Sequence, residues 1–285
     1  MSRRRLLGLA VLAATIALPT LATAQTPAAN LPERLRTGGT ITVGLNPIYP
    51  PMEYRNPGNN QLVGADVDLA AELFKRLGLR VAVQEFAFAQ LIPSLTTERI
   101  DVIWSGMSDL PARREAMDFV NYMRSGAQFV TLARRAAEFP DAMALCGKRV
   151  GTARTTSFPK GIEDWSTANC LPAGRPAIIV VGNDSTADAR VHLRQERIDA
   201  AVQGSETVGY TFSLDPGLYA TVGAPFTQVL QGIGVRKTDT ALRDAIAATL
   251  QAMIDDGSYG RIMDKYNLPN NKLERAAING EPLPR

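Results

Sequence analysis

The sequence predicts an α/β fold made of two similar lobes. Stretches that alternate like β-strands are followed by amphipathic helices, a pattern typical of a mostly parallel sheet. This series occurs twice in the 285 residues, and each time Glu-Arg-Ile-Asp introduces an apolar strand, at Glu98–Asp101 and at Glu196–Asp199. A content of 45% hydrophobic residues suits one large or two medium domains. We therefore expect a duplicated structural unit rather than a chance tetrapeptide match.

The first series begins with the strand Thr40–Leu45, whose side chains alternate and which ends in a Pro-rich turn. Residues 65–79 place Leu69, Leu73 and Leu77 on one helical face, and Gly78 is a typical C-cap. The series continues with a strand at 80–85, a short helix at about 91–97 and a strand at 100–104.

The second series follows an extended connection at 126–134. We expect its strands at 148–153, 177–181 and 198–203, and its helices at about 156–165 and at 186–197. A further strand at 232–237 leads into an amphipathic helix at 239–257. In open α/β sheets, ligands bind beyond the carboxyl ends of the strands, which here are Ser105–Ser108 and Gln203–Glu206. These two ends are expected to face each other across a cleft.

The N-terminus has the pattern of an export signal. Three arginines, Arg3 to Arg5, precede the apolar run Leu6–Leu21 and the small residues Ala22–Ala24, so residues 1–24 are expected to be cleaved after Ala24. An uncleaved membrane anchor is disfavoured because Pro19 interrupts a run shorter than about 20 residues. A general secretory signal and a twin-arginine signal both remain open.

Export determines how the charges and cysteines are interpreted. Without the three signal arginines, 28 basic residues balance 28 acidic ones, which gives no basis for a nucleic-acid partner. Outside the cytoplasm, Cys146 and Cys170 are expected to form one disulfide. His192 is the single histidine, so we expect no metal site and no histidine-based catalytic triad.

An ordered series of motifs resembles the extracellular solute-binding proteins of polar amino-acid ABC transporters, family 3. The motifs run from about Leu35 to Asn267 and include VGLNPIYPPMEY, LVGADVDLAAELFKRLG, LIPSL, RIDVIWSGMSDLPARRE, DFVNYMRSG, KRVGTARTTS, RIDAAVQG, GIGVRK and DGSYGRIMDKY. The resemblance implies a type II periplasmic-binding-protein fold, whose lobes are joined by a two-stranded hinge and close on a ligand.

The resemblance also implies domain limits and a function. Lobe 1 is expected at 36–130 plus 232–270, lobe 2 at 135–228, the hinge near 129–132 and 230–233, and a C-terminal tail at 271–285. The implied protein is a periplasmic monomer without cofactor or catalytic residue, which delivers an amino acid or related small carboxylate to an ABC transporter permease. A cyclohexadienyl-dehydratase-like enzyme is the alternative, with Glu206 as its general acid. A sensory lobe is the third and least favoured class.

Three side chains carry the implied ligand contacts of the first lobe. Tyr49 and Phe88 match the aromatic residues that cover the ligand on its two sides. Arg113 matches the residue that binds the ligand carboxylate, which a planar guanidinium can hold through two hydrogen bonds. The other interpretations are core packing for the rings and a solvated charge for the arginine.

Backbone and hydroxyl groups supply the rest of the implied shell. Ser105, Gly106 and Ser108 match the segment that completes it in the first lobe. Thr155 and Thr156 match a segment at a helix N-terminus in the second lobe, where N–H groups and hydroxyls attract an anion. One of these threonines can cap the helix, and capping and ligand binding can occur together.

The sequence departs from the family pattern at the end of the second Glu-Arg-Ile-Asp strand. The family usually has an aspartate there for the ligand's α-ammonium, whereas this chain has Gly204. Glu206 can replace that charge if the loop turns inward, or it can lie in the exposed first turn of a helix. Together with an added charge at Arg154, the loss favours a ligand with extra negative charge or without an α-amino group.

Overall fold

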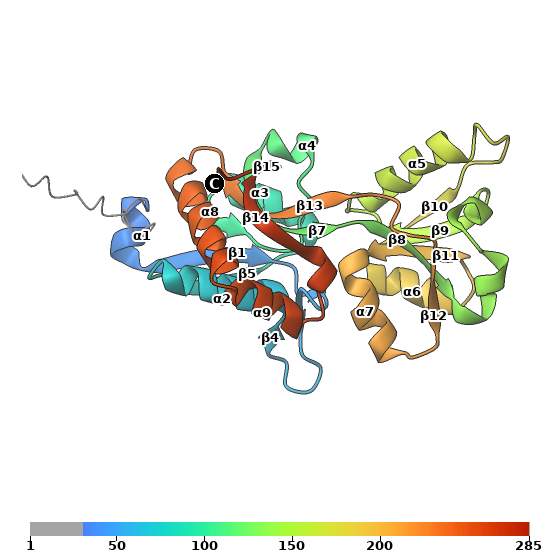
Figure 1. Ribbon diagram of the computed structural model, residues 1–285, viewed down its shortest axis with the longest axis horizontal. Coiled ribbons are helices and arrows are strands. Elements are labelled where there is room, and N and C mark those ends of the chain that lie inside the picture. The colour runs from blue at the N-terminus through green and yellow to red at the C-terminus, as the bar shows by residue number, and fades with distance from the viewer. Residues whose placement is uncertain (1–30, 285) are drawn as a thin grey trace, which may run out of the picture.

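The computed structural model describes residues 31–284, which form two α/β lobes side by side (Figure 1). The expected signal segment and its cleavage site lie outside the described residues. Within the described part, no helix combines the length and the apolar character needed to cross a membrane.

The first lobe is built on a seven-stranded sheet in the order β15-β14-β7-β13-β6-β1-β5. Its strands are β1 (Thr40–Leu45), β5 (Arg80–Glu85), β6 (Val102–Ile103), β7 (Met117–Ser125), β13 (Val229–Arg236), β14 (Lys272–Ile278) and β15 (Glu281–Pro282). Its helices are α1 (Glu33–Gly38), α2 (Ala65–Arg76), α3 (Leu91–Thr96), α4 (Pro111–Arg114), α8 (Thr240–Asp255) and α9 (Ser258–Lys265). A small sheet of β2 (Ile48–Tyr49), β3 (Glu53–Arg55) and β4 (Leu62–Val63) joins β1 to α2.

The second lobe has a five-stranded sheet in the order β10-β9-β11-β8-β12. Its strands are β8 (Ala127–Leu132), β9 (Arg149–Ala153), β10 (Ile179–Asn183), β11 (Ala200–Gly204) and β12 (Tyr219–Val222), and its helices are α5 (Phe158–Asn169), α6 (Thr186–Arg194) and α7 (Ser205–Leu214). Both sheets are covered on two faces. In the first lobe α2 and α8 pack on one face and α3 on the other, while α5 and α6 lie on opposite faces of the second sheet.

The two Glu-Arg-Ile-Asp segments adopt the same local structure, so the predicted structural repeat is present. Each begins with a glutamate at positive φ, 61° at Glu98 and 55° at Glu196. Each aspartate then accepts a hydrogen bond from the backbone of a parallel neighbouring strand, Asp101 from Thr42 at 2.8 Å and Asp199 from Arg149 at 3.0 Å. The shared segment therefore fixes the same β-strand entry in both lobes.

The isoleucine of each segment is buried against a glycine of the neighbouring strand. Ile100 packs over Gly44 of β1 and Ile198 over Gly151 of β9, both isoleucines being 1% exposed. A Cβ atom on either glycine would overlap the Cδ1 atom of its isoleucine. Each lobe thus needs a glycine in this strand to bring the repeated strand into register.

The chain crosses between the sheets earlier than the sequence suggested. Strand β7 belongs to the first sheet and β8 to the second, so the first crossing is at Gly126, whereas residues 129–132 pair within the second sheet. Residues 230–233 lie within the first sheet in β13, and the return crossing precedes them. The two crossings contact each other, since Ala127 donates a backbone hydrogen bond to Thr227 Oγ1 at 2.8 Å. The limits of the lobes as moving units remain a prediction.

The C-terminal segment is part of the first sheet, although the sequence analysis treated residues 271–285 as a tail. Strand β14 pairs with β7, and Asn279 accepts a hydrogen bond from the backbone of Phe119 at 2.8 Å. The buried Ala276 and Ala277 hold this strand against the lobe. Small alanine side chains gave too weak a hydrophobic pattern to predict it.

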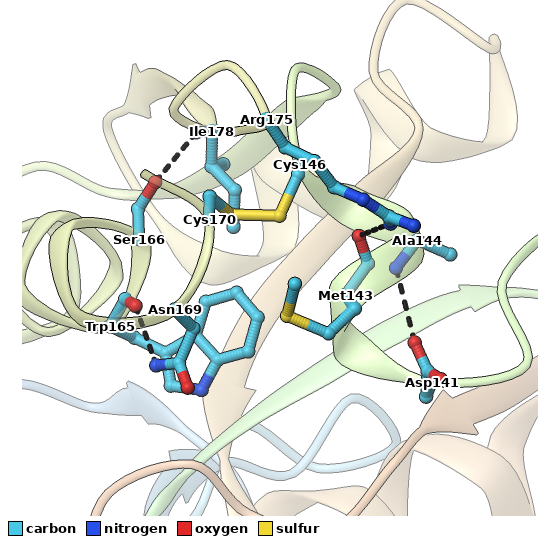
Figure 2. Close-up of a disulfide and its surroundings, with 10 residues drawn as sticks. All are labelled: Asp141, Met143, Ala144, Cys146, Trp165, Ser166, Asn169, Cys170, Arg175 and Ile178. Atoms are coloured by element: carbon cyan, nitrogen blue, oxygen red, sulfur yellow. Dashed lines mark hydrogen bonds between the residues drawn. A yellow bond between two sulfur atoms is a disulfide. The ribbon is translucent and has the colours of Figure 1, made fainter. Parts of the chain in front are cut away.

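The expected disulfide joins Cys146 and Cys170, with a Cα–Cα distance of 5.6 Å (Figure 2). It ties the end of a short 3₁₀ helix (Ala142–Leu145) to the C-terminal end of α5. Cys170 is fully buried in the apolar core on that side of the second lobe.

Two buried carboxyl groups lie beneath the segment that follows β6. Glu53 accepts a hydrogen bond from Ser105 Oγ at 2.6 Å, and Asp66 accepts from Tyr122 Oη at 2.9 Å and from the Gly106 backbone at 3.0 Å. Their remaining oxygens, Glu53 Oε2 and Asp66 Oδ1, have no donor among the described residues when both groups are ionised. Burial, reinforced by the charge of Asp66, raises the pKa of Glu53 well above its ordinary value, and burial raises the pKa of Asp66 to about 6. A proton on Glu53 that is donated to Asp66 satisfies both oxygens.

Removing the disulfide should lower the stability of the second lobe. The 24-residue separation gives the unfolded chain extra loop entropy when the bond is absent, which corresponds to about 3 kcal/mol. We expect a Cys146→Ala/Cys170→Ala variant to lose this amount of unfolding free energy in urea titrations. Equal unfolding midpoints for variant and wild type would contradict the expectation.

The shared proton predicts a specific pH dependence. Because the native pKa of Glu53 is raised, its contribution to stability is complete below the unfolded value near 4.5 and is lost as pH rises through the native pKa. Glu53→Gln keeps a donor at this position without titrating. Wild type should therefore lose unfolding free energy relative to this variant as pH rises above about 4.5, by at most about 1.4 kcal/mol per pH unit. A stability difference that is constant over this range would show that Glu53 carries no proton.

Candidate functional site

A cavity with an empty volume of about 650 Å³, part of it open to solvent, lies where the carboxyl ends of strands from both sheets meet. Eight of the ten residues expected at the site line it, namely Tyr49, Phe88, Ser105, Gly106, Ser108, Arg113, Thr155 and Thr156. Gly204 and Glu206 do not line it. Further lining residues were not predicted from the sequence, among them Asn46, Glu53, Ser157, Asp184, Ser185 and Gln231.

Arg113 presents a largely free guanidinium to this cavity. It comes from the short helix α4, donates to the backbone oxygen of Ser108 at 2.9 Å and lies 5.6 Å from the centre of the Phe88 ring. No carboxylate pairs with Arg113 among residues 31–284, and burial lowers its pKa. Its neighbour Arg114 differs, because it forms two hydrogen bonds with Asp109, one of them at 3.0 Å. A half-buried arginine without a carboxylate partner can bind an anionic group through two parallel hydrogen bonds.

The segment after β6 has one serine hydroxyl that faces across the cavity and another that is hydrogen-bonded within the first lobe. Ser108 Oγ lies 3.4 Å from Ser157 Oγ of the second lobe. Ser105 Oγ is occupied within the first lobe, since it accepts from the Asn46 backbone at 3.0 Å and donates to Glu53. Ser108 is therefore the hydroxyl of this segment that faces across the cleft.

Gly106 provides room for the aromatic wall. Its φ is +52°, and a Cβ atom there would lie 2.8 Å from the Tyr49 ring and 3.4 Å from Gln231 Oε1. Both the backbone conformation and the close approach of the ring favour glycine at this position.

Two helix N-termini of the second lobe open into the cavity. Ser157 precedes α5 and Ser185 precedes α6, where Ser185 Oγ accepts the Asp188 N–H at 3.0 Å. Thr156 binds the first turn of α5, since its hydroxyl accepts from the Phe158 backbone at 3.2 Å, while Ser157 is the N-cap residue. Helix N-termini and hydroxyls make this wall favourable for an anion. The pattern Asn-Asp-Ser-Thr before an amphipathic helix was the available signal for Ser185.

Arg154 does not add a free positive charge to the site. It pairs with Asp184 at 2.9 Å, and both side chains are mainly exposed at the edge of the cavity. The inference from Arg154 to an extra negative charge on the ligand therefore has no support in the structure.

Glu206 turns inward and is 3% exposed, so its interpretation as part of an exposed helix turn is wrong. Its carboxylate accepts hydrogen bonds from Tyr49 Oη, from Ser125 Oγ at 2.5 Å and from Gln231 Nε2 at 2.9 Å. Burial and the charge of Glu206 raise the pKa of Tyr49, which keeps the phenol protonated as a donor. The glutamate thus joins the second lobe to the first lobe and to the crossing strands.

The same arrangement explains why residue 204 is a glycine. A Cβ atom at Gly204 would lie 2.6 Å from Glu206 Cδ and would overlap the Tyr49 hydroxyl. The Glu206 carboxylate therefore occupies the space that an aspartate side chain at position 204 would need. Glu206 lies outside the lining of this cavity, so it is not placed to act as a general acid on a ligand there, and the enzyme alternative is not favoured.

Comparisons with known proteins agree with this architecture. A family model described as bacterial extracellular solute-binding proteins, family 3, matches residues 41–269. The arginine-binding protein ArgT of Corynebacterium glutamicum is 29% identical over 90% of this chain and 83% of its own length. The histidine-binding periplasmic protein of Salmonella typhimurium is 32% identical over 79% of this chain and 86% of its own.

Solved structures show the same two-lobed fold. An ancestral arginine-binding protein bound to arginine superposes with a TM-score of 0.70 at 28% identity, covering 80% of this chain and 98% of its own. An ancestral amino acid-binding protein, AncCDT-1, described as a precursor of cyclohexadienyl dehydratase, gives 0.71 at 26% identity over 82% and 97%. The fold is thus the type II periplasmic-binding-protein fold, and the chain belongs to the bacterial extracellular solute-binding proteins, family 3.

Proposed function

We propose that this protein captures an α-amino acid between its lobes and delivers it to the permease of an ABC transporter. The observation that carries the proposal is the half-buried guanidinium of Arg113, which faces the cavity without a carboxylate partner in the described part of the chain. Relatives that share most of its length are named as arginine- and histidine-binding proteins, which supports an amino acid as the ligand.

The ligand carboxylate would bind Arg113 on one side and the second lobe on the other. The Ser108 and Ser157 hydroxyls are 3.4 Å apart across the cleft, so a carboxylate beside them contacts both lobes at once. The N-terminus of α5 adds a favourable dipole at this place. A ligand that bridges the lobes in this way stabilises the closed cleft, because its contacts are complete only when the lobes are together.

The aromatic residues would form the walls beside the ligand. Phe88 is held under the Arg113 guanidinium, and Tyr49 is held by Glu206 of the opposite lobe. These partners fix both rings before a ligand binds, which reduces the entropy lost on binding. Ser105 and Gly106 would support the site from below.

Closure would present a defined surface to the permease. Outside the cavity, Tyr54 of the first lobe and Tyr210 of the second pack with ring centres 5.4 Å apart. Such contacts fix the relative orientation of the lobes when a ligand is bound. A permease can recognise this orientation. The relatives include periplasmic proteins, and we extend this location to the present chain, as a monomer released by cleavage after Ala24.

Replacing Arg113 should abolish tight binding. We expect isothermal titration with a panel of L-amino acids, including arginine and histidine, to give at least one micromolar ligand. Arg113→Ala should bind that ligand about 100-fold more weakly, which corresponds to about 2.7 kcal/mol.

Arg114→Ala is the matched control, because Arg114 lies on the same helix but pairs with Asp109 outside the cavity. It should retain the wild-type affinity. Unchanged affinity in Arg113→Ala would disprove the carboxylate assignment, and no binding by wild type to any amino acid would disprove the function.

Expression of the full chain in a Gram-negative host tests the location. The periplasmic fraction should contain a protein whose N-terminal residue is Gln25, whereas Ala24→Asp should accumulate as the longer precursor because the cleavage site requires small residues. A wild-type product that remains in the cytosol at full length would rule out the signal.

A further inference from the structure

An anchor for the carboxylate does not explain how an amino acid is distinguished from other small acids. That distinction requires an acceptor for the α-ammonium group, and burying an ammonium without one costs several kcal/mol. Gly204 offers no side chain, and the Glu206 carboxylate is outside the cavity lining. The following inference rests on the proposed function and concerns the residue that binds this ammonium.

Two residues of the cavity lining have a buried side-chain oxygen without a donor in the described structure. They are Glu53, through Oε2, and Gln231, through Oε1. Glu53 forms a side-chain hydrogen bond with Asp66 when the pair shares one proton, so its oxygen has a partner within the first lobe. Gln231 Oε1 therefore remains the buried acceptor at the cavity wall that has no partner in the described structure.

The orientation of the Gln231 amide is set by its other end. Its Nε2 atom donates to Glu206 Oε1 at 2.9 Å, and a carboxylate accepts hydrogen bonds without donating them. The amide nitrogen must therefore point to Glu206, which leaves Oε1 on the opposite side of the amide group. The side chain is 3% exposed and has little freedom to rotate.

The position of Gln231 also suits an α-ammonium. Gln231 pairs as an isolated β-bridge with Ser108, the residue whose backbone oxygen binds Arg113. Gln231 Oε1 lies 3.4 Å from the place where a Cβ of Gly106 would be, so it is next to the same segment. A ligand whose carboxylate is on Arg113 thus lies against the segment that Gln231 also contacts.

We propose that Gln231 Oε1 accepts a hydrogen bond from the α-ammonium group of the ligand, and that Glu206 supplies the compensating charge through the Gln231 amide. The Glu206 carboxylate lies where the carboxylate of an aspartate at position 204 would be. Tyr49 and Gln231 separate it from the ligand. Hydrogen bonds in series polarise one another, so the amide oxygen becomes a stronger acceptor while its nitrogen is bound to a carboxylate. Gln231 is a specificity-determining residue and Glu206 is its positioning residue.

The test compares amino acids with the same molecules lacking the α-amino group. L-Arginine is paired with 5-guanidinopentanoic acid and L-histidine with 3-(imidazol-4-yl)propanoic acid, each titrated calorimetrically into the full mature chain. Wild type should bind at least one amino acid about 30-fold more tightly than its deaminated partner. Gln231→Met should reduce this ratio about 10-fold, because it lowers the affinity for the amino acid. The affinity for the deaminated acid should change by less than about 3-fold.

Two further variants keep the result interpretable. Gln203→Met replaces another buried glutamine, on β11 and away from the cavity, and should leave the ratio unchanged. Glu206→Gln removes the charge and should also lower the ratio, which tests the inference even if Gln231→Met does not fold, as judged by circular dichroism and thermal unfolding.

The outcomes separate this inference from the proposed function. Folded Gln231→Met and Glu206→Gln variants that retain the wild-type ratio would overturn the inference while leaving amino-acid capture in place. Equal wild-type affinity for both members of a pair would also overturn it, because the amino group would then not be recognised. Failure of wild type to bind any amino acid would overturn both.

Discussion

The carboxylate of Glu206 is the point at which the two lobes and their connection meet. It accepts hydrogen bonds from Tyr49 of the first lobe, from Ser125 at the start of the first crossing and from Gln231 on the strand after the second. A buried carboxylate is costly unless donors surround it, so these three groups are held in one arrangement. The missing side chain at Gly204 makes this arrangement possible, because any Cβ there would occupy the same space.

The second constraint is the repeated strand entry. In both lobes a glutamate at positive φ, a buried isoleucine and an aspartate that binds a neighbouring strand begin the strand whose far end reaches the cleft. Identical entries give the two lobes equivalent strand ends, and different residues follow these ends in the two lobes. Ser108 and Arg113 follow in the first lobe, whereas Gly204 and Glu206 follow in the second.

Much of the fold was predictable because its signals are local. The apolar periodicity of α2 and α8 and the alternation in β1 depend on residues that are close in sequence. The long strand β7 was missed because it is buried almost throughout and contains Asp118 and Asn121, so it lacks both alternation and uniform apolarity. Next to the crossing at Gly126, Ala127 binds Thr227, 100 residues away, which no local pattern reveals.

The site shows the same division. Arg113 and Tyr49 were found by their motifs, but Gln231 lies in an apolar strand with no polar pattern, and its importance comes from Glu206 turning inward. The most direct test is a crystal structure of the protein with the amino acid that binds most tightly. The ligand carboxylate should form two hydrogen bonds with Arg113, and the α-nitrogen should lie within hydrogen-bonding distance of Gln231 Oε1. An α-nitrogen bound instead to Asp184 or Glu53, with Gln231 free of the ligand, would contradict the account.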